Sequence, residues 1–396
     1  ATFDFDSKNI KLAYEGKEDD IVKSIEAGNV SMTTGSSLIR GSTALFGLKT
    51  QLQFGKLTAT ALVSQQNSES KTVNTKGGAQ TTDFSVNADQ YDQNRHFFLS
   101  QYFYENYDKF AARLPYVSSG INITRIEVWV TNKSGRYDQA RNVVAFTDLG
   151  ESSRRASSYW TPNATVPVPS NNSNDLLSII KEQYPDARNI NQVTQALAPL
   201  GAHGIEGGKD YEKIESARLL SSSEYTLNST LGYISIKSQI NADEVLGVAF
   251  QYTYNGQVYQ VGEFSSDITS TTQSLYVKML KSTTTDPKMP MWRLMMKNVY
   301  SLGAYQVQKS NFRLNIKYLS DTTGTQINYL PVPGLNNQSL LQVMNLDRID
   351  SNEQSNPDGF FDFIEGYTII SSTGKIIFPV AEPFGKHLEE KIDNPA

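Results

Sequence analysis

The feature that most constrains the fold is a strict alternation of apolar and polar residues near the N-terminus. Phe46, Leu48, Leu52 and Phe54 alternate with Gly47, Lys49, Gln51 and Gln53, and after Gly55-Lys56 the alternation resumes over Leu57–Val63. A period of two is typical of a β-strand with two unlike faces, and a glycine-containing pair between two such runs indicates a turn. We therefore expect a β-hairpin, either packed on a soluble core or forming a barrel wall with one face on lipid.

The rest of the chain also favours strands. Its 396 residues include 21 Tyr and 18 Phe, and such side chains suit a pleated, half-buried surface. Strands are expected at Ile121–Val130, Val143–Phe146, Leu231–Ile236, Val245–Tyr254, Val258–Phe264, Phe312–Leu319, Gln326–Leu330, Leu340–Leu346, Phe361–Ile369 and Lys375–Val380. Asn255-Gly256 is a typical two-residue hairpin turn. We predict a mainly β fold: an antiparallel, β-sandwich-like body with helical inserts, plus the N-terminal hairpin.

Helical patterns interrupt the strands in three places. We expect an aromatic helix within Asp89–Leu114, a helical insert at 174–220 in which Tyr211–Leu220 forms one further short helix, and a short helix within Met289–Gly303. A passage rich in Ser, Asn and Pro, at about 151–174, indicates a linker or surface excursion. The predicted regions are 1–66 with the hairpin, 67–120 with a loop and the aromatic helix, 121–388 as the β-sandwich-like domain, and a polar tail at 389–396.

Composition excludes several classes of protein. The chain has no Cys, so disulfide frameworks, Cys-ligated metals and thiol nucleophiles are excluded. A formal net charge of -5 argues against nucleic-acid binding. No stretch of about 18 apolar residues occurs, which argues against a transmembrane helix. The N-terminus lacks the basic and apolar regions of a signal peptide, so we expect a mature chain or an excised piece.

The strongest chemical motif lies near the C-terminus. If Gly359 takes the sharp-turn position of a calcium loop, the third, fifth, ninth and twelfth positions are Asn356, Asp358, Asp362 and Glu365. Gln354 at the first position and Pro357 within the loop weaken this calcium site. The alternative is a Pro-Asp-Gly turn leading into a strand. Asp358, Asp362, Glu365 and Glu382 are also candidates for the paired carboxylates of glycoside hydrolysis, but the sequence does not show the distances that would separate them in a cleft.

Long segments of the chain resemble a known family. They are Gly28–Gln66, which contains SSLIRGSTALFGLKTQLQFGKLTATALVSQQ, and the later runs RHFFLSQYFYENYDKF, ITRIEVWVTN, NADEVLGVAFQYTYNGQVYQVGEF, LMMKNVYSLGAYQV, NPDGFFDFIEGYTI and GKIIFPVAEPFGKHL. Together they resemble the SprA/Sov family, the giant outer-membrane translocon of the Bacteroidota type IX secretion system. The resemblance runs from about Gly28 to Leu388.

The resemblance implies a role in protein export. Family members form a very large single-chain β-barrel with a lateral opening. Their partners are a PorV-like shuttle protein and a periplasmic plug protein. Secreted substrate proteins cross the outer membrane through it. No catalytic residues carry over, and because full-length members are several times longer, this chain is expected to be an internal fragment.

We therefore predict a non-catalytic domain of an outer-membrane protein-export channel involved in type IX secretion and gliding. It would shape the channel and dock the remainder of the translocon barrel, the shuttle, the plug and the secreted proteins. The expected location is the outer membrane or cell envelope, on a face that the sequence leaves open. The alternatives are a cell-surface, calcium-assisted glycan-binding or adhesive module and, last, a carbohydrate-active enzyme.

Overall fold

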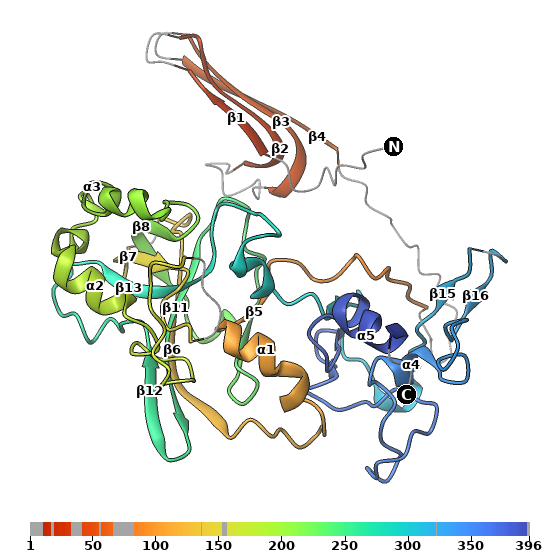
Figure 1. Ribbon diagram of the computed structural model, residues 1–396. Coiled ribbons are helices and arrows are strands. Elements are labelled where there is room, and N and C mark those ends of the chain that lie inside the picture. The colour runs from red at the N-terminus through yellow and green to blue at the C-terminus, as the bar shows by residue number, and fades with distance from the viewer. Residues whose placement is uncertain are drawn as a thin grey trace. The chain divides into compact units, whose positions relative to one another are not determined.

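The computed structural model describes residues 11–16, 20–32, 42–54, 57–65, 83–135, 137–152, 157–321 and 323–393. These residues fall into two compact units (Figure 1). The first is drawn from Ala1–Gly78, Ile240–Glu244 and Thr283–Asp286. The second is drawn from Ala79–Gln239, Val245–Ser282 and Pro287–Ala396.

The first unit contains a four-stranded antiparallel sheet. Its strands are β1 (Lys11–Glu15), β2 (Val22–Met32), β3 (Ser42–Phe54) and β4 (Leu57–Gln65), which pair in chain order. Phe54 is paired with Leu57, so β3 and β4 are joined across two residues. The hairpin predicted from the alternating pattern is confirmed, and β1 and β2 extend it into a larger sheet.

The second unit is built around a small closed β-barrel. Its strands are β6 (Ile121–Val130), β7 (Arg141–Phe146), β8 (Tyr211–Leu219), β11 (Leu246–Tyr254) and β13 (Leu275–Lys281), and β12 (Gln257–Val261) forms a hairpin with β11. The strand order is β12-β11-β13-β7-β8-β6, and β6 also pairs with β11, which closes the barrel. β7 and β13 run parallel, whereas the other barrel pairs are antiparallel. A mainly β chain with several antiparallel sheets is confirmed, but the body is a closed barrel where we predicted a sandwich.

Small residues inside the barrel explain how the sheet closes. A Cβ atom at Gly247 would lie 2.7 Å from Val277 and 3.5 Å from Ala145, so only glycine fits there without displacement. The fully buried ring of Trp129 belongs to the same interior cluster. Side chains from five strands share one narrow interior, and large residues must therefore alternate with small ones.

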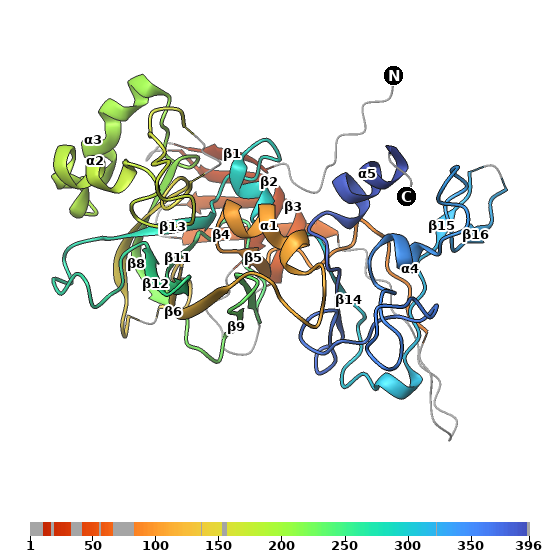
Figure 2. The ribbon, with the colours of Figure 1, turned by 60° about the horizontal axis from the view of Figure 1, so that its bottom comes forward.

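The helical insert covers the outer face of the barrel, where both ribbon views place α2 and α3 beside β13 (Figures 1 and 2). It consists of α2 (Leu176–Gln183), the 3-10 helix η2 (Pro185–Arg188), α3 (Val193–Leu197) and the 3-10 helix η3 (Ala198–His203). Apolar residues of these helices pack on Val144 and Phe146 of β7 and on Tyr276 of β13. Trp160 joins this cluster, so the passage expected to be a linker is packed against the body.

The short helix expected at Tyr211–Leu220 is wrong, because these residues form strand β8. Its buried residues Tyr211, Ile214 and Ala217 lie three apart, which resembles a helical pattern. The register with β7 shifts by one residue between Arg141 and Val143, and a β-bulge of this kind breaks the period of two.

The aromatic helix is shorter than predicted. β5 (His96–Phe98) precedes α1 (Gln101–Phe110), and β5 forms a sheet with β10 (Tyr233–Ile236) and β9 (Tyr225–Asn228). The ring of Phe103 fills the space beside Gly232, whose backbone φ is +70°. The aromatic stripe therefore faces the core, as its spacing indicates.

The C-terminal part of the second unit has short elements. They are the 3-10 helices η4 (Pro290–Arg293) and η5 (Lys309–Asn311), the strands β14 (Val299–Ser301), β15 (Tyr318–Leu319), β16 (Gln326–Ile327), β17 (Ile369–Ile370) and β18 (Lys375–Ile377), the helix α4 (Leu340–Val343), a π-helical turn η6 (Pro383–His387) and α5 (Leu388–Asp393). Three expected strands fail here. Leu340–Leu346 begins with a helix, because Ser339 and Gln342 form a capping box. Phe361–Ile369 is strand only at its last residue, and Phe312–Leu319 is strand only at Tyr318–Leu319. The short helix expected within Met289–Gly303 is present as the 3-10 helix η4, and β14 follows it.

Candidate functional site

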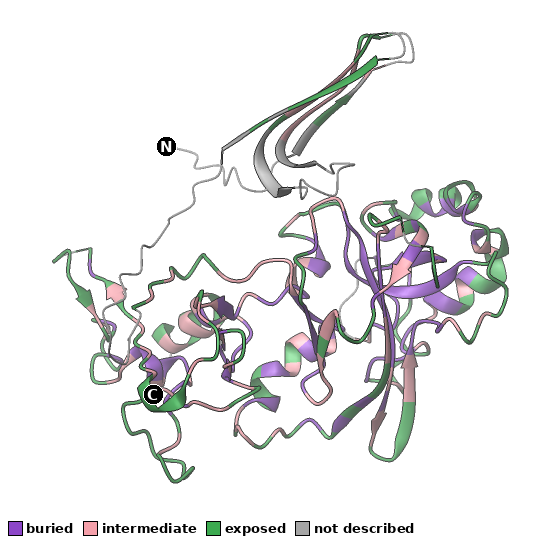
Figure 3. Cartoon of the chain, turned by 180° about the vertical axis from the view of Figure 1, so that it is seen from behind, coloured by how far each residue is buried: buried purple, intermediate pink, exposed green. Residues whose placement is uncertain are grey.

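The four-stranded sheet presents an apolar face. Cross-strand partners share a face, and the register pairs Leu48 with Val63, Leu52 with Ala59 and Phe54 with Leu57. Exposed large side chains on this face are Tyr14 (53%), Leu48 (46%), Phe54 (54%), Leu57 (66%) and Val63 (73%). Figure 3 shows the contrast: the described residues of this sheet are exposed or intermediate, whereas the barrel strands are largely buried.

The opposite face of the same sheet carries polar side chains. Lys49, Gln51 and Gln53 alternate with the apolar positions of β3, and Thr58 and Thr60 do so on β4. Glu26 of β2 is paired with Lys49, and their charged groups lie 3.8 Å apart. The sheet thus has one apolar face and one polar face.

An apolar face of this size is unfavourable in water. Burying one large aliphatic or aromatic side chain contributes about 1.5–3 kcal/mol, and at least five such side chains are exposed here. Among the described residues, β1 and β4 each pair with a single neighbouring strand, so both edges of the sheet offer unpaired backbone groups. Within the described residues, the sheet therefore combines an exposed apolar face with two open edges.

The residues proposed to bind calcium are held by backbone hydrogen bonds. Asp358 and Gly359 donate their backbone N–H groups to the carboxylate of Asp347, at 2.9 Å and 3.1–3.2 Å. The carboxylate of Asp358 in turn accepts the N–H of Phe360 at 3.0 Å. These contacts hold the backbone of residues 358 to 360 in place beside Asp347.

The other two proposed ligands lie further along this loop. Asp362 accepts the backbone N–H groups of Arg348 (2.7 Å) and Ile349 (3.3 Å), and Glu365 accepts that of Ser371 at 3.0 Å. Burial, together with the charges of Asp347 and Asp358, raises the pKa of Asp362 to about 6, although these hydrogen bonds act to lower it. Across the described ranges, no group of three or more His, Asp or Glu side chains is arranged to hold a metal ion. The calcium site stays a prediction from the sequence.

Glu382, the fourth carboxylate that was a candidate for glycoside hydrolysis, makes a contact within the fold. It accepts a hydrogen bond of 2.8 Å from the hydroxyl of Tyr104 on α1. This contact ties the C-terminal segment to the aromatic helix.

The structure also contains a Ser–His–Asp hydrogen-bond chain that the sequence did not reveal. The Nδ1 atom of His96 lies 2.7 Å from the hydroxyl of Ser235, and its Nε2 atom lies 3.0 Å from Asp92. Lys375 also contacts Asp92, at 2.6 Å. Burial would raise the pKa of Asp92, but the hydrogen bonds from His96 and Lys375 outweigh it and lower the pKa to about 2. His96 is 3% exposed, so this cluster joins β5, β10 and β18 and offers no accessible nucleophile.

A second buried polar contact links α1 to the barrel. Glu151 and Lys278 form an ion pair of 2.5 Å, and both side chains are 1% exposed. The carboxylate also accepts the backbone N–H of Gln101, the first residue of α1, at 3.1 Å. Burial raises the pKa of Glu151, and Lys278 opposes that shift. The partners are far apart in sequence, and no local motif identifies them.

Comparison with known proteins places the chain among motility-related secretion proteins. It matches the SprA_N family, described as motility related/secretion protein, over residues 1–259. This match spans more than half of the chain, and the chain belongs to the SprA_N family. A search of curated proteins finds no match.

The family resemblance seen in the sequence is thereby confirmed, although its segments after residue 259 lie outside the match. The family is a secretion and motility family and not a known enzyme family. The described helices include none that is both long and apolar enough to cross a membrane.

Proposed function

We propose that this chain is a non-catalytic part of an outer-membrane protein-export channel. In this proposal the four-stranded sheet contributes strands to a membrane-embedded wall, and the second unit is a water-facing body that docks partner proteins. The observation that carries the proposal is the exposed apolar face of the sheet, opposite a polar face that holds the Glu26–Lys49 pair.

The dimensions of the sheet suit a membrane wall. A strand needs about 9–11 residues to cross the hydrocarbon core, and β2, β3 and β4 have 11, 13 and 9 residues. In such a wall one face meets lipid and the other meets water, which requires the alternation seen in β3 and β4. The free edges of β1 and β4 would pair with strands from the remainder of the translocon barrel.

The second unit supplies candidate docking residues. Tyr116 and Tyr305 are 77% and 79% exposed, and tyrosine is enriched at protein–protein interfaces. The partners that the family context suggests are a PorV-like shuttle protein, a plug protein and secreted proteins in transit. Co-purification of these proteins with the chain from outer membranes would support the docking role.

Membrane association of the sheet can be tested with one pair of variants. The chain should float with phospholipid vesicles. Val63→Arg should weaken this binding, because an arginine on the lipid face is unfavourable, by an amount that falls from about 2–4 kcal/mol at the bilayer centre to about 0–1 kcal/mol near the interfaces. Thr60→Arg, on the polar face of the same strand, should bind like the parent chain. A chain that stays monomeric in buffer and does not float with the vesicles would contradict the proposal.

A further inference from the structure

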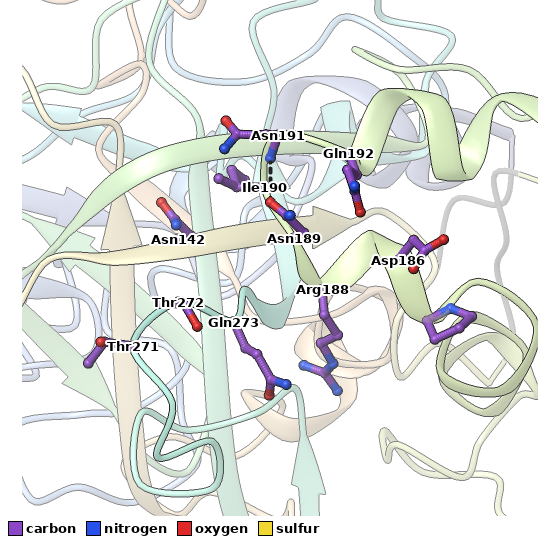
Figure 4. Close-up of a pocket in the computed structure, with 11 residues that line it drawn as sticks. Asn142, Asp186, Arg188, Asn189, Ile190, Asn191, Gln192, Thr271, Thr272 and Gln273 are labelled. Atoms are coloured by element: carbon purple, nitrogen blue, oxygen red, sulfur yellow. Dashed lines mark hydrogen bonds between the residues drawn. The ribbon is translucent and has the colours of Figure 1, made fainter.

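A polar cleft of about 510 Å³ opens on the second unit, away from the features described above (Figure 4). One wall is the segment from η2 to the start of α3, and the other is the loop that precedes β13. Its polar lining includes Asn142, Asp186, Asn191, Gln192, Thr271 and Gln273. Its volume lies within the range of about 300–1,000 Å³ that is typical of small-ligand sites.

The first wall is fixed to the barrel by Arg188. Its guanidinium forms two hydrogen bonds of 2.6 and 2.7 Å to the carboxylate of Glu263 and lies 3.8 Å from the centre of the Tyr276 ring. It also donates to the carbonyl of Ser274 at 2.8 Å. A bidentate pair of this kind is geometrically specific. The positive charge of Arg188 is therefore paired with Glu263 and is not available to a ligand.

The second wall is fixed by Arg141. This buried guanidinium donates to the carbonyl oxygens of Ser265 (3.2 Å), Ile268 (2.8 Å) and Ser270 (2.9 Å), which holds the loop that leads to Thr271. Next to it, Asn142 lies at the register shift of β7 and accepts the N–H of Ser216 at 3.0 Å. The cleft is therefore built on two anchored segments, and its shape exists before any ligand arrives.

The free groups in the cleft are neutral donors and acceptors, with one carboxylate. The side chains of Asp186, Asn191, Gln192 and Gln273 form no hydrogen bond or ion pair with other described residues. An amide offers two donors and an acceptor, whereas a carboxylate offers acceptors alone. Together these groups can satisfy a ligand that carries several adjacent hydroxyl groups.

Other ligand classes fit the cleft poorly. A nucleic acid or phosphate needs unpaired cations, but the arginine in this lining is engaged by Glu263. Peptide recognition generally uses a free strand edge, an apolar groove, an aromatic-lined groove or an arginine cluster, and the lining of this cleft has none of these. A neutral polyol remains as the matching class.

We propose that this cleft binds a neutral glycan, with Asp186 accepting hydrogen bonds from sugar hydroxyls and Asn191, Gln192 and Gln273 both donating and accepting them. Ile190, which lines the cleft and is 7% exposed, provides an apolar contact for a sugar ring. The inference rests on this cleft alone and holds independently of the membrane role of the sheet.

The test uses the full chain on an array of neutral glycans, acidic glycans and uncharged peptides, followed by titration of the strongest neutral glycan. Asp186→Ala and Gln192→Ala should each weaken that binding by about tenfold, because each removes a polar contact to the ligand. The matched controls Glu182→Ala and Gln195→Ala change exposed residues of α2 and α3 outside the cleft and should leave binding unchanged.

Thermal unfolding of all four variants checks that the fold is retained, which is expected because each position is exposed. Equal affinity in the cleft and control variants would overturn the proposal. So would an array that captures the chain only on peptides or acidic glycans, or not at all.

Discussion

The carboxylate of Glu151 lies 2.5 Å from the ammonium group of Lys278, in a site where both side chains are almost fully buried. The pair connects the segment after β7 to strand β13, and Glu151 also holds the first turn of α1. It is therefore one polar contact that attaches α1 to the barrel, beside the ring contacts of Phe103 with Phe250 and Tyr252.

Lys278→Met should destabilise the chain by about 3–5 kcal/mol, because it leaves a buried carboxylate without its partner. The double variant Glu151→Gln with Lys278→Met should recover most of this loss, since glutamine still accepts the Gln101 N–H and carries no charge. Lys213→Met removes the exposed pair with Glu215 and should cost at most about 1 kcal/mol. Denaturant unfolding measures all three, and an equal loss in the single and double variants would refute the role of the pair.

Gly247→Ala should destabilise the barrel by about 1–3 kcal/mol, because the new methyl group would overlap Val277 in a closed interior. Combining it with Val277→Ala should restore part of the stability. Gly201→Ala is the control, since a Cβ atom at that position meets no atom within 4 Å. If Gly247→Ala were as stable as Gly201→Ala by thermal unfolding, the barrel interior would be less crowded than described.

Asp362 should make the stability of the chain depend on pH. Its folded pKa of about 6 is higher than the unfolded value near 3.8, so the folded state binds the proton more tightly. The contribution of Asp362 to the free energy of unfolding should therefore be greatest below pH 3.8. It should fall by about 3 kcal/mol as the pH rises to 6. Asp362→Asn should remove this slope from denaturant unfolding measured across the interval, whereas Asp138→Asn at an exposed position should leave it. A parent chain that gained stability over this interval through Asp362 would contradict the sign.

Local patterns predicted the local structure well. The alternation at Phe46–Val63 forms β3 and β4, and Asn255 and Gly256 form the expected turn with φ of 50° and 77°. Closure of the barrel could not be predicted, because it depends on β7 pairing with β13 and on β6 pairing with β11, and strand periodicity carries no information about distant partners.

Other errors had local causes. The bulge in β8 gave a strand the spacing of a helix, and the capping box at Ser339 turned an expected strand into α4. The buried polar clusters were harder to predict, because Asp92 of a loop, His96 of β5 and Ser235 of β10 are brought together only by the pairing of β5 with β10. The two faces of the N-terminal sheet, in contrast, were visible in the sequence because they depend on a single hairpin.

The central claim is that the apolar face of this sheet meets lipid while its other face meets water. Because the chain has no cysteine, Val63→Cys and Gln51→Cys each introduce one reactive group, on opposite faces of neighbouring strands. The measurement is the rate at which a membrane-impermeant, charged thiol reagent labels each variant in native outer membranes, compared with the rate after detergent extraction and unfolding. We predict that Gln51→Cys is labelled in the membrane and that Val63→Cys is protected until the protein is extracted and unfolded. Rapid labelling of Val63→Cys in intact membranes, at the rate of Gln51→Cys, would contradict the account.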